Sequence, residues 1–495
     1  MGGAAVNAVD YGDVQGLVRF GYRHLKAARY LLLGIRDRQA AQAWLSAAPV
    51  TSAEFRQPPP PDALHVALTA AGLQALGVPA ALAAQFSPEF LGGMTDASRT
   101  RRLGDTGSNA PTHWRWGGSA STPHVLVMCF ARDLAGLDAM VARTTGGDFV
   151  RAFDVQHALD TSDQDGIEPF GFADGLSQPS IDWEQATDPA ERMLDYGERA
   201  ALGEFVLGYA NEYGKFTDRP LVAPGPDSTA LPDAADEPAM KDVGRNGTYL
   251  VLRQLVQDVR GFWRFVHGAA GGDPEAADRL ASAFVGRTRD GEPLVSPDAL
   301  GRGQNDFTFD ADPRGVVCPM GAHIRRSNPR NADFPGRPTG VRKLLAALGG
   351  SSKGFRDDLI APVRFHRILR RGREYGPSLE PADAVQAAPP GEAERGLHFV
   401  CLNANLSRQF EFLQNAWLMN TTFADLRGET DPLVGTRESL PGCPATGEFS
   451  WPQEGAPARR VDGLPQFVTV KGGEYFFLPG LRALRYLSSL GGRLP

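Results

Sequence analysis

Short apolar segments alternate with single amphipathic helices in both halves of this chain, and this alternation constrains the fold more than any other feature. Apolar runs of roughly four to eight residues bounded by turn residues indicate strands, whereas apolar positions at helical spacing indicate helices. Helices that follow single strands can cover the face of an antiparallel sheet. We therefore predict an α+β fold, and no short-period repeat indicates a solenoid instead.

Each half carries its own set of predicted elements. The first half has strands at 15–22, 28–33, 124–130 and 149–155, and helices at 37–48 and 134–144. The second half has strands at 248–253, 363–369, 398–402, 467–470 and 475–478, and helices at 256–268, 407–419 and 480–490. Two such sets predict two units, each with helices packed on an antiparallel sheet.

Residues 215–245 separate the two sets. This segment is rich in Pro, Asp and Ala and has no hydrophobic period, which is typical of a linker or a long surface loop. A chain of 495 residues is long enough for two or more cores. We therefore predict an N-terminal domain at 1–225 and a C-terminal domain at 226–495.

Charge and composition exclude several classes of protein. Lys and Arg number 51 against 58 Asp and Glu, a net charge of -7, so no basic face for nucleic acid is indicated. No apolar run reaches the roughly 20 residues that a membrane helix needs, and the N-terminus shows no secretory signal pattern. The cysteines form no paired motif, so we expect buried free thiols and a cytoplasmic protein. These cysteines are Cys129, Cys318, Cys401 and Cys443.

The first candidate site is the segment 168–179, Glu-Pro-Phe-Gly-Phe-Ala-Asp-Gly-Leu-Ser-Gln-Pro. Asp174 stands between Gly171 and Gly175, and glycines permit backbone angles and close approaches that other residues resist. A carboxylate held in this way can face a large flat ligand at short range. Asp-Gly is also a common turn, so an ordinary turn is the alternative for this segment taken alone.

The second candidate site is the segment 318–330, in which His323 is followed by Arg325, Arg326 and Arg330. A neutral imidazole is a metal ligand, and arginines bind carboxylates or phosphates with their planar fork. Haem combines an iron centre with two propionates and commonly takes a histidine as axial ligand. The pattern therefore indicates a haem site, and a turn with a packed or exposed histidine is the alternative.

The third candidate is Arg370, at the start of Arg-Arg-Gly-Arg-Glu-Tyr-Gly (370–376). It follows a predicted apolar strand and precedes a turn that contains glycine. Two interpretations stay open for this residue. It is either a charge at the end of a surface strand or a fixed positive charge at a catalytic cavity.

Together the three segments resemble those of dye-decolourising peroxidases. Residues 171–175 resemble that family's Gly-x-x-Asp-Gly motif, the segment around His323 resembles its proximal-histidine motif, and Arg370 falls where its distal arginine stands. The resemblance extends from residue 14 to residue 478, nearly the whole chain. It implies two ferredoxin-like domains, with haem b held mainly by the C-terminal one.

The resemblance implies a haem-dependent peroxidase that uses hydrogen peroxide to oxidise aromatic donors such as dyes and phenols through an oxoferryl haem. Arg370 would stabilise the leaving hydroxide and Asp174 would relay the proton, with the division of work between them left open. His323 would be the iron ligand, and its second N–H would bind Asp431 first or Asp425 second. The alternative role for Asp431 is a helix or turn cap.

The resemblance also suggests where the cofactor is held. Arg326 is the first candidate for a propionate contact and Arg325 or Arg330 the next, and Gly175 is placed with the cofactor-binding residues. His323 and Arg370 are 47 positions apart (370 minus 323), wider than in compact members, which predicts an inserted loop at 337–359.

Two positions depart from the family's usual pattern. Gly372 stands where relatives often carry a polar residue, which suggests a wider or wetter opening, and Glu374 stands where proline is common.

Three further points stay open at this level. A haem-binding or haem-handling protein with incidental peroxidase activity is the alternative function, because one fold accommodates both. A phosphate site at 349–353 is disfavoured, because the string lacks the spacing of a phosphate loop. Assembly of the chain into a homo-oligomer also stays open. Four aromatic residues could pass electrons to bulky donors, although residues of this kind more often belong to the hydrophobic core. They are Trp263, Trp417, Tyr249 and Tyr375.

Overall fold

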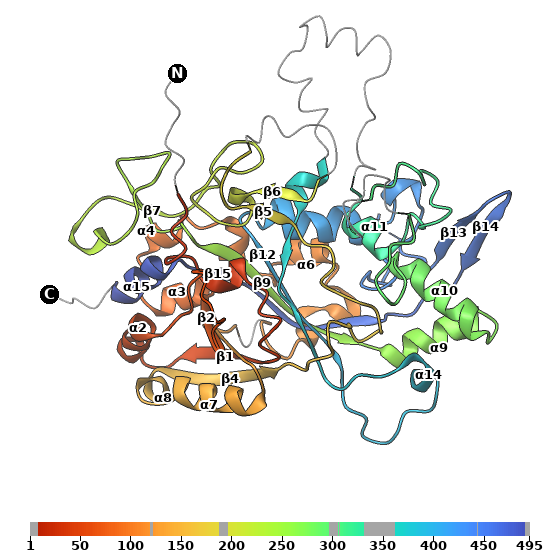
Figure 1. Ribbon diagram of the computed structural model, residues 1–495, viewed down its shortest axis with the longest axis horizontal. Coiled ribbons are helices and arrows are strands. Elements are labelled where there is room, and N and C mark those ends of the chain that lie inside the picture. Colours follow the sequence, from red (N-terminus) through yellow and green to blue (C-terminus); the bar gives the residue numbers. More distant parts are fainter. Residues whose placement is uncertain are drawn as a thin grey trace, which may run out of the picture.

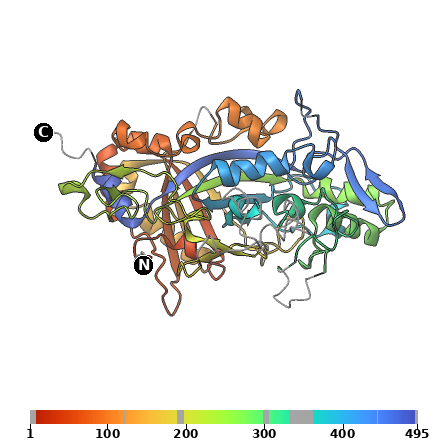
Figure 2. The ribbon, with the colours of Figure 1, turned by 90° about the horizontal axis from the view of Figure 1, so that it is seen from above.

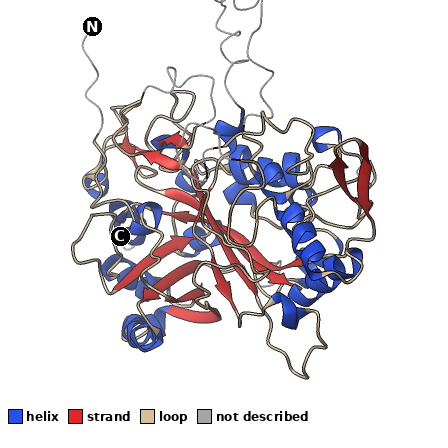
Figure 3. Cartoon of the chain, turned by 45° about the vertical axis from the view of Figure 1, so that its right-hand side comes forward, coloured by secondary structure: helices blue, strands red, loops and turns tan. Residues whose placement is uncertain are grey.

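A single antiparallel sheet of nine strands crosses the molecule (Figures 1 and 3). The computed structural model describes residues 8–118, 122–187, 197–296, 305, 307–330, 362–442 and 444–490. Figure 3 shows the strands of this sheet in the centre, with many helices gathered to one side of it. Seen from above, further helices of the N-terminal half lie along the top of the molecule (Figure 2). The architecture is thus α+β, as predicted.

The strands fall into two sets that repeat one order. The first set is β1 (Ala27–Ile35), β2 (Asp62–Leu68), β3 (Val125–Ala131) and β4 (Phe153–Asp160). The second is β9 (Thr248–Gln257), β10 (Leu369–Arg370), β11 (Arg373–Tyr375), β12 (Gly396–Asn403) and β15 (Val468–Leu478). The sheet order is β10-β12-β9-β15-β2-β3-β1-β4, with β11 also paired to β12. Counting β10 and β11 as one, each set is arranged fourth, first, third, second, which is a ferredoxin-like arrangement.

Helices follow the first and third strands of each set. They are α2 (Arg38–Ala47) and α7 (Leu134–Thr144) in the first set, and α9 (Val259–Ala269) with the π-helical segments η6 (Ser407–Glu411) and η7 (Leu413–Leu418) in the second. An aspartate precedes each of these three α-helices, and its side chain accepts a backbone N–H of the first turn. These caps are Asp37, Asp133 and Asp258. Such a cap stabilises a helix by about 1 kcal/mol, which helps to fix where these helices begin.

Shorter elements complete the described chain. The remaining α-helices are α1 (Gly16–Arg19), α3 (Ala70–Ala75), α4 (Ala80–Ala83), α5 (Pro88–Gly92), α6 (Ala97–Leu103), α8 (Asp148–Ala152), α10 (Pro274–Val285), α11 (His323–Ser327), α14 (Pro381–Ala384) and α15 (Leu481–Ser489). The 3-10 turns are η1 (Gly107–Asn109), η2 (Pro111–His113), η3 (Leu202–Glu204), η4 (Pro226–Ser228), η5 (Pro362–His366) and η8 (Phe423–Asp425). The short strands are β5 (Ser180–Asp182), β6 (Arg199–Ala201), β7 (Leu221–Val222), β8 (Lys241–Asp242), β13 (Phe449–Gln453) and β14 (Ala456–Val461).

Strand β15 joins the two sets into one sheet. It pairs along its length with β9 and meets β2 where Phe477 lies opposite Leu68. The C-terminal helix α15 packs on α2 of the first set, and the Gln42 side chain donates to the Leu490 carbonyl at 2.7 Å. One buried cluster includes Val66 and Val251 from the two sets. The two ferredoxin-like units therefore share part of their core.

Most predicted elements are present, and the exceptions have physical causes. The predicted strand at 15–22 is wrong, because only the short helix α1 forms there. The predicted strand at 363–369 is also wrong over most of its length, since η5 occupies it before the two-residue β10. Short apolar runs do not distinguish a strand from a buried turn of helix. The segment 149–155 is split between α8 and β4, and the segments 467–470 and 475–478 are one strand, β15, with a bulge between Val470 and Gly472.

Several other expectations can be compared with the described residues. Strand β2 was missed by the sequence prediction, and the segment 215–245 includes the paired strands β7 and β8. Cys129, Cys318 and Cys401 are free and buried, as predicted. Cys443 and the segments 337–359 and 349–353 lie outside the described residues. Within the described part of the chain, no helix is long and apolar enough to cross a membrane.

Candidate active site

Residues from all three sequence segments line one cavity of about 300 Å³. Asp174, His323, Arg330 and Arg370 all contribute to its wall. Cavities of this size hold small molecules or cofactors. Since these residues come from three segments that are well separated along the chain, the cavity brings together what the sequence suggested only separately.

Asp174 and Arg370 form an ion pair on one part of the wall. The Arg370 Nη1 donates to Asp174 Oδ1 at 2.9 Å, and its Nη2 donates to the Ser177 carbonyl at 3.2 Å. The Gln178 side chain bonds the backbone N–H and carbonyl of Arg370 at 3.0 and 3.3 Å, so it fixes the end of β10. About a third of each side chain of the pair is exposed (34% and 32%), and since both residues line the cavity, the exposed part is available there.

The environment of Asp174 favours its ionised form. Burial by itself would raise the pKa of Asp174, but the charge of Arg370 and the backbone N–H of Gly175 outweigh it and lower the pKa. Gly171 and Gly175 have φ angles of 93° and 72°, a region that side chains resist. Gly175 itself does not line the cavity. Its contribution is therefore the N–H and the turn that present Asp174.

His323, the first residue of α11, is held from behind by Asp431. The His323 Nδ1 lies 2.9 Å from Asp431 Oδ2, and Asp431 Oδ1 accepts the N–H groups of Leu433 and Val434, each at 2.9 Å. Burial would raise the pKa of Asp431, yet its contact with His323 lowers it. Because an ionised carboxylate only accepts, Nδ1 carries the proton and Nε2 is the nitrogen left for a ligand on the cavity side.

Of the four arginines predicted for the site, two line the cavity and two do not. Arg326 is buried, and its guanidinium donates to the Trp417 and Asn420 carbonyls at 2.6 and 3.1 Å and to the Glu429 carbonyl. Arg325 donates to Asp312 and to the Cys318 carbonyl. Neither residue lines the cavity, in contrast to Arg330 and Arg370. Arg330, one of the two second candidates for a propionate contact, lines the cavity although it too donates to backbone carbonyls, those of Asn305 and Phe307 at 2.7 and 2.8 Å, so the propionate contacts stay a prediction.

Arg287 is a cavity residue that the sequence did not reveal. It follows α10, and its guanidinium donates to the Gly291 carbonyl at 2.7 Å and to Asn305 Oδ1 at 2.8 Å. Burial and the nearby charges of Arg330 and Arg370 lower its pKa to about 10. Three mutually repelling cations on one cavity wall favour a ligand with carboxylates. No motif marks Arg287, since a single arginine after a helix is unremarkable in a sequence.

The rest of the wall is largely apolar. The strands β9 and β12 contribute side chains from one sheet face, where Arg253 and Leu255 lie opposite Phe399 and Leu397 in the register. Further apolar wall residues are Phe170, Phe172, Ile324, Leu413, Leu418 and Leu433. Apolar walls with a few convergent polar groups are typical of cofactor sites.

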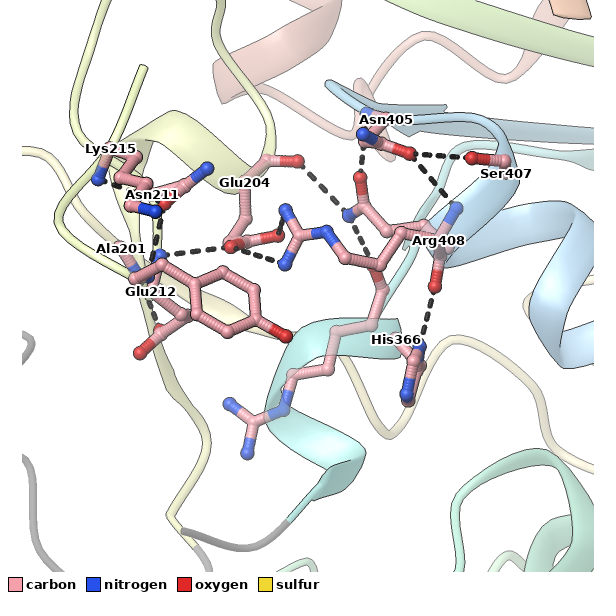
Figure 4. A network of polar contacts seen from close by, with 12 residues as sticks. Ala201, Glu204, Asn211, Glu212, Lys215, His366, Asn405, Ser407 and Arg408 are labelled. Atoms are coloured by element: carbon pink, nitrogen blue, oxygen red, sulfur yellow. Dashed lines mark hydrogen bonds and ion pairs between the residues drawn. The ribbon is translucent and has the colours of Figure 1, made fainter. Parts of the chain in front are cut away.

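A network of buried polar contacts lies behind another part of the wall (Figure 4). Arg408 donates to both carboxylate oxygens of Glu204 at 3.1 and 2.9 Å, and its carbonyl lies 2.5 Å from His366 Nδ1. A carbonyl only accepts, so Nδ1 of His366 carries the proton. Burial lowers the pKa of His366 to about 4, which keeps the ring neutral near pH 7. The network thus fixes an uncharged ring on the cavity wall.

The four aromatic residues named for electron transfer are buried. Tyr249 is 0% exposed, and Trp263, Trp417 and Tyr375 are 3%, 5% and 8% exposed. Trp417 alone of the four lines the cavity. None of them offers a surface contact to a bulky donor.

The residues of the cavity fit a haem group. His323 offers a nitrogen that its Asp431 contact leaves open, arginines that include Arg287 and Arg330 line the cavity, and apolar side chains line much of the remainder. Among the described residues, no group of three His, Cys, Asp or Glu side chains could hold a metal ion by itself. A single axial histidine is nevertheless sufficient for iron that a macrocycle already holds.

Comparisons with known proteins bear on this fit. No family model matches the chain. The multifunctional dye peroxidase DyP2 of Amycolatopsis sp. is 32% identical over 342 residues, which are 66% of this chain and 62% of that relative. The dye-decolorizing peroxidase AauDyP1 of Auricularia auricula-judae is 28% identical over 522 residues, covering 99% of this chain and 88% of the relative. The chain is thus similar to dye-decolourising peroxidases along nearly its whole length.

Solved structures agree with this similarity. The structure of DyP2 from Amycolatopsis sp. matches with a TM-score of 0.66 at 26% identity and covers 96% of each chain. The structure of the decolorizing peroxidase from Auricularia auricula-judae matches with a TM-score of 0.72 at 24% identity, covering 97% of this chain and 100% of that one. The predicted family, fold class and peroxidase activity are thereby confirmed. As a dye-decolourising peroxidase, the chain is an oxidoreductase that acts on peroxide.

Proposed function

We propose that this peroxidase uses hydrogen peroxide to oxidise phenols and aromatic dyes, with haem b in the cavity and His323 as its axial ligand. The observation that carries the proposal is the presence, in one cavity, of the His323–Asp431 pair and the Asp174–Arg370 pair. A structure of a dye-decolorizing peroxidase in complex with 2,6-dimethoxyphenol supports phenols as donors. Neither the site nor the relatives favour the haem-handling alternative.

Haem, held by His323, would supply the redox-active iron for reaction with peroxide. The chain's own residues have separate tasks in that reaction. Asp174 is ionised near neutral pH, because Arg370 and the Gly175 N–H lower its pKa, so it can accept the first proton of the peroxide and return it to the departing oxygen. Arg370 would stabilise the negative charge that develops on that oxygen.

Other residues would bind and orient the cofactor. His323 donates its Nδ1–H to Asp431, which fixes the ring and makes Nε2 a stronger ligand. Arg287 and Arg330 are the proposed partners of the propionates, since both line the cavity. Gly175 shapes the turn that carries Asp174. The domains proposed are 1–225 and 226–495, and the three buried free thiols support a reducing, cytoplasmic location.

An absorbance spectrum with and without hydrogen peroxide tests the function. The purified protein should show a ferric haem Soret band that changes on addition of peroxide and returns when 2,6-dimethoxyphenol is added. The His323→Ala variant should lose most of its haem or show an altered ligand spectrum. A His323→Ala protein with full haem content and an unchanged spectrum would refute the axial-ligand assignment, and turnover no faster than that of free haem would refute the enzyme.

A further inference from the structure

Glu168 closes the turn that leads to Asp174. Its Oε2 accepts the Phe170 N–H at 3.1 Å and its Oε1 accepts the Phe172 N–H at 3.2 Å. Its own N–H donates to the Phe172 carbonyl at 2.8 Å, and its carbonyl accepts the Gly171 N–H at 2.7 Å. One carboxyl side chain thus bonds the backbone on either side of Gly171, whose φ is 93°.

The same loop is tied to the second half of the chain at a few further points. The Gln257 side chain, at the end of β9, donates to Glu168 Oε2 at 2.8 Å. The Ala173 N–H donates to the Arg289 carbonyl at 2.9 Å, and the Trp263 ring N–H donates to the Phe170 carbonyl at 3.0 Å. The position of Asp174 therefore depends on contacts that begin at Glu168, six positions earlier.

Glu168 differs from Asp174 in its electrostatic surroundings. Both carboxylates line the cavity. Asp174 pairs with Arg370, whereas the described contacts of Glu168 are all neutral N–H groups. Burial raises the pKa of Glu168 to about 7. Its hydrogen bonds oppose this rise, and the charge of Asp174 contributes to it. Two acids with pKa values pushed apart by their environments are often used for different tasks in one reaction.

We propose that Glu168 is a positioning residue for Asp174, and that its ionised carboxylate holds the loop in the form that reacts with peroxide. This proposal rests on the peroxidase function proposed above. An ionised carboxylate accepts all three N–H groups, whereas a protonated one loses part of its acceptor capacity and the strength of its charge-assisted bonds. Protonation of Glu168 therefore loosens the turn next to Asp174.

The sign of the pH dependence follows from the ionised state being the active one. The reaction with peroxide should increase as the pH rises through about 7, where Glu168 loses its proton. Other charged groups act on this site from neighbouring elements: Asp174 faces Glu168 directly, and Arg370 and His323 act on Asp174. Glu374 is the competing source of such a step, since burial and then Asp174 raise its pKa to about 7 as well.

Glu374 provides a matched control, because it does not line the cavity and no described hydrogen bond joins its side chain to residues 168–174, although the charge of Asp174 acts on both glutamates. The experiment measures the rate constant of the haem-loaded protein with hydrogen peroxide by stopped flow between pH 5 and pH 9. Glu168→Gln should abolish the step near pH 7, whereas Glu374→Gln should retain it. Infrared difference spectra of the same proteins should show a protonated carboxyl signal that titrates near pH 7, and Glu168→Gln should remove a component of it that Glu374→Gln retains.

A second variant keeps the test decisive if Glu168→Gln does not fold. Gln257→Leu removes one donor to the ionised carboxylate, so the step should move to higher pH by about one unit, since a hydrogen bond to a charged group is worth about 1.5 kcal/mol or more. A step near pH 7 that persists in Glu168→Gln, or does not move in Gln257→Leu, would overturn the positioning role. A wild-type protein that does not react with peroxide at any pH would instead contradict the proposed function.

Discussion

Replacement of Arg370 by leucine tests the division of work at the peroxide side of the cavity. The variant removes the cation that bonds Asp174 at 2.9 Å and leaves the Ser177 carbonyl without its donor. Loss of one preorganised charged donor to a developing oxyanion typically lowers a rate by about 10² to 10³. We expect a decrease of that size in the rate constant for hydrogen peroxide, with the haem still bound because His323 is untouched.

The same variant should also change the pH dependence in a defined direction. Arg370 is the largest of the influences that lower the pKa of Asp174, while burial acts in the opposite sense. Without it the pKa of Asp174 rises, so the fraction of ionised Asp174 is lost at a higher pH. The activity that remains should therefore decline sooner as the solution is acidified.

Stopped-flow absorbance at several pH values measures both effects. Arg371→Lys is the matched control, since Arg371 is the next residue, does not line the cavity, and donates to the Leu17, Val18 and Arg370 carbonyls. That variant should keep the wild-type rate. An Arg370→Leu protein with an unchanged peroxide rate would remove Arg370 from the mechanism, and a lower rate with an unchanged pH profile would show that Arg370 does not govern the ionisation of Asp174.

Two further predictions concern the opposite side of the site. Asp431→Asn removes the negative charge 2.9 Å from His323 Nδ1. The reduction potential of the haem iron should therefore rise, as measured by spectroelectrochemical titration. An unchanged or lower potential would contradict this role of Asp431. Arg326→Met removes the donors to the Trp417, Asn420 and Glu429 carbonyls, each worth about 1 kcal/mol or more when left unsatisfied. The free energy of unfolding should therefore fall by about 3 kcal/mol or more in urea denaturation, and a loss below about 1 kcal/mol would count against the structural role.

The sequence located the reactive residues better than the residues that surround them. Asp174, His323 and Arg370 each stand in a short motif with glycines or a conspicuous charge, and all three line the cavity. Arg287 has no such context, because its place depends on where α10 ends and on the carbonyl of Gly291. A cavity wall formed by tertiary contacts leaves little trace in local sequence.

The same limit explains the arginines after His323. A run of cations beside a histidine indicates carboxylate binding only if their guanidinium groups reach the cavity. Arg325 instead donates to the nearby Cys318 and Asp312, and Arg326 donates to backbone carbonyls of a distant segment that includes Glu429. Buried carbonyls need donors as strictly as a cofactor needs counter-charges. Local spacing cannot show which of these two needs an arginine serves.

Secondary structure was predictable where the hydrophobic period was long and the ends were marked. Helices α2, α7 and α9 have aspartate caps and match their predicted positions within a few residues. The segments around α1 and η5 are short apolar runs, and tertiary contacts determine their secondary structure. At α1, for example, the Gly16 N–H donates to the Thr51 carbonyl, and the Gln15 side chain donates to the carbonyls of Val66 and Pro479.

Asp174, the proposed proton acceptor, is held by both halves of the chain, although the sequence places it in the first. Asp174 lies before residue 225, but Glu168 of the same loop bonds Gln257 of β9, and Asp174 itself bonds Arg370 of β10. His323 and Asp431 lie wholly in the second half. A C-terminal half alone would therefore keep the proposed iron ligand but lose the proton acceptor. Since β15 already joins the two sets of strands into one sheet, the shared sheet holds the loop of one half over the cavity of the other, and peroxide chemistry requires that both be folded together.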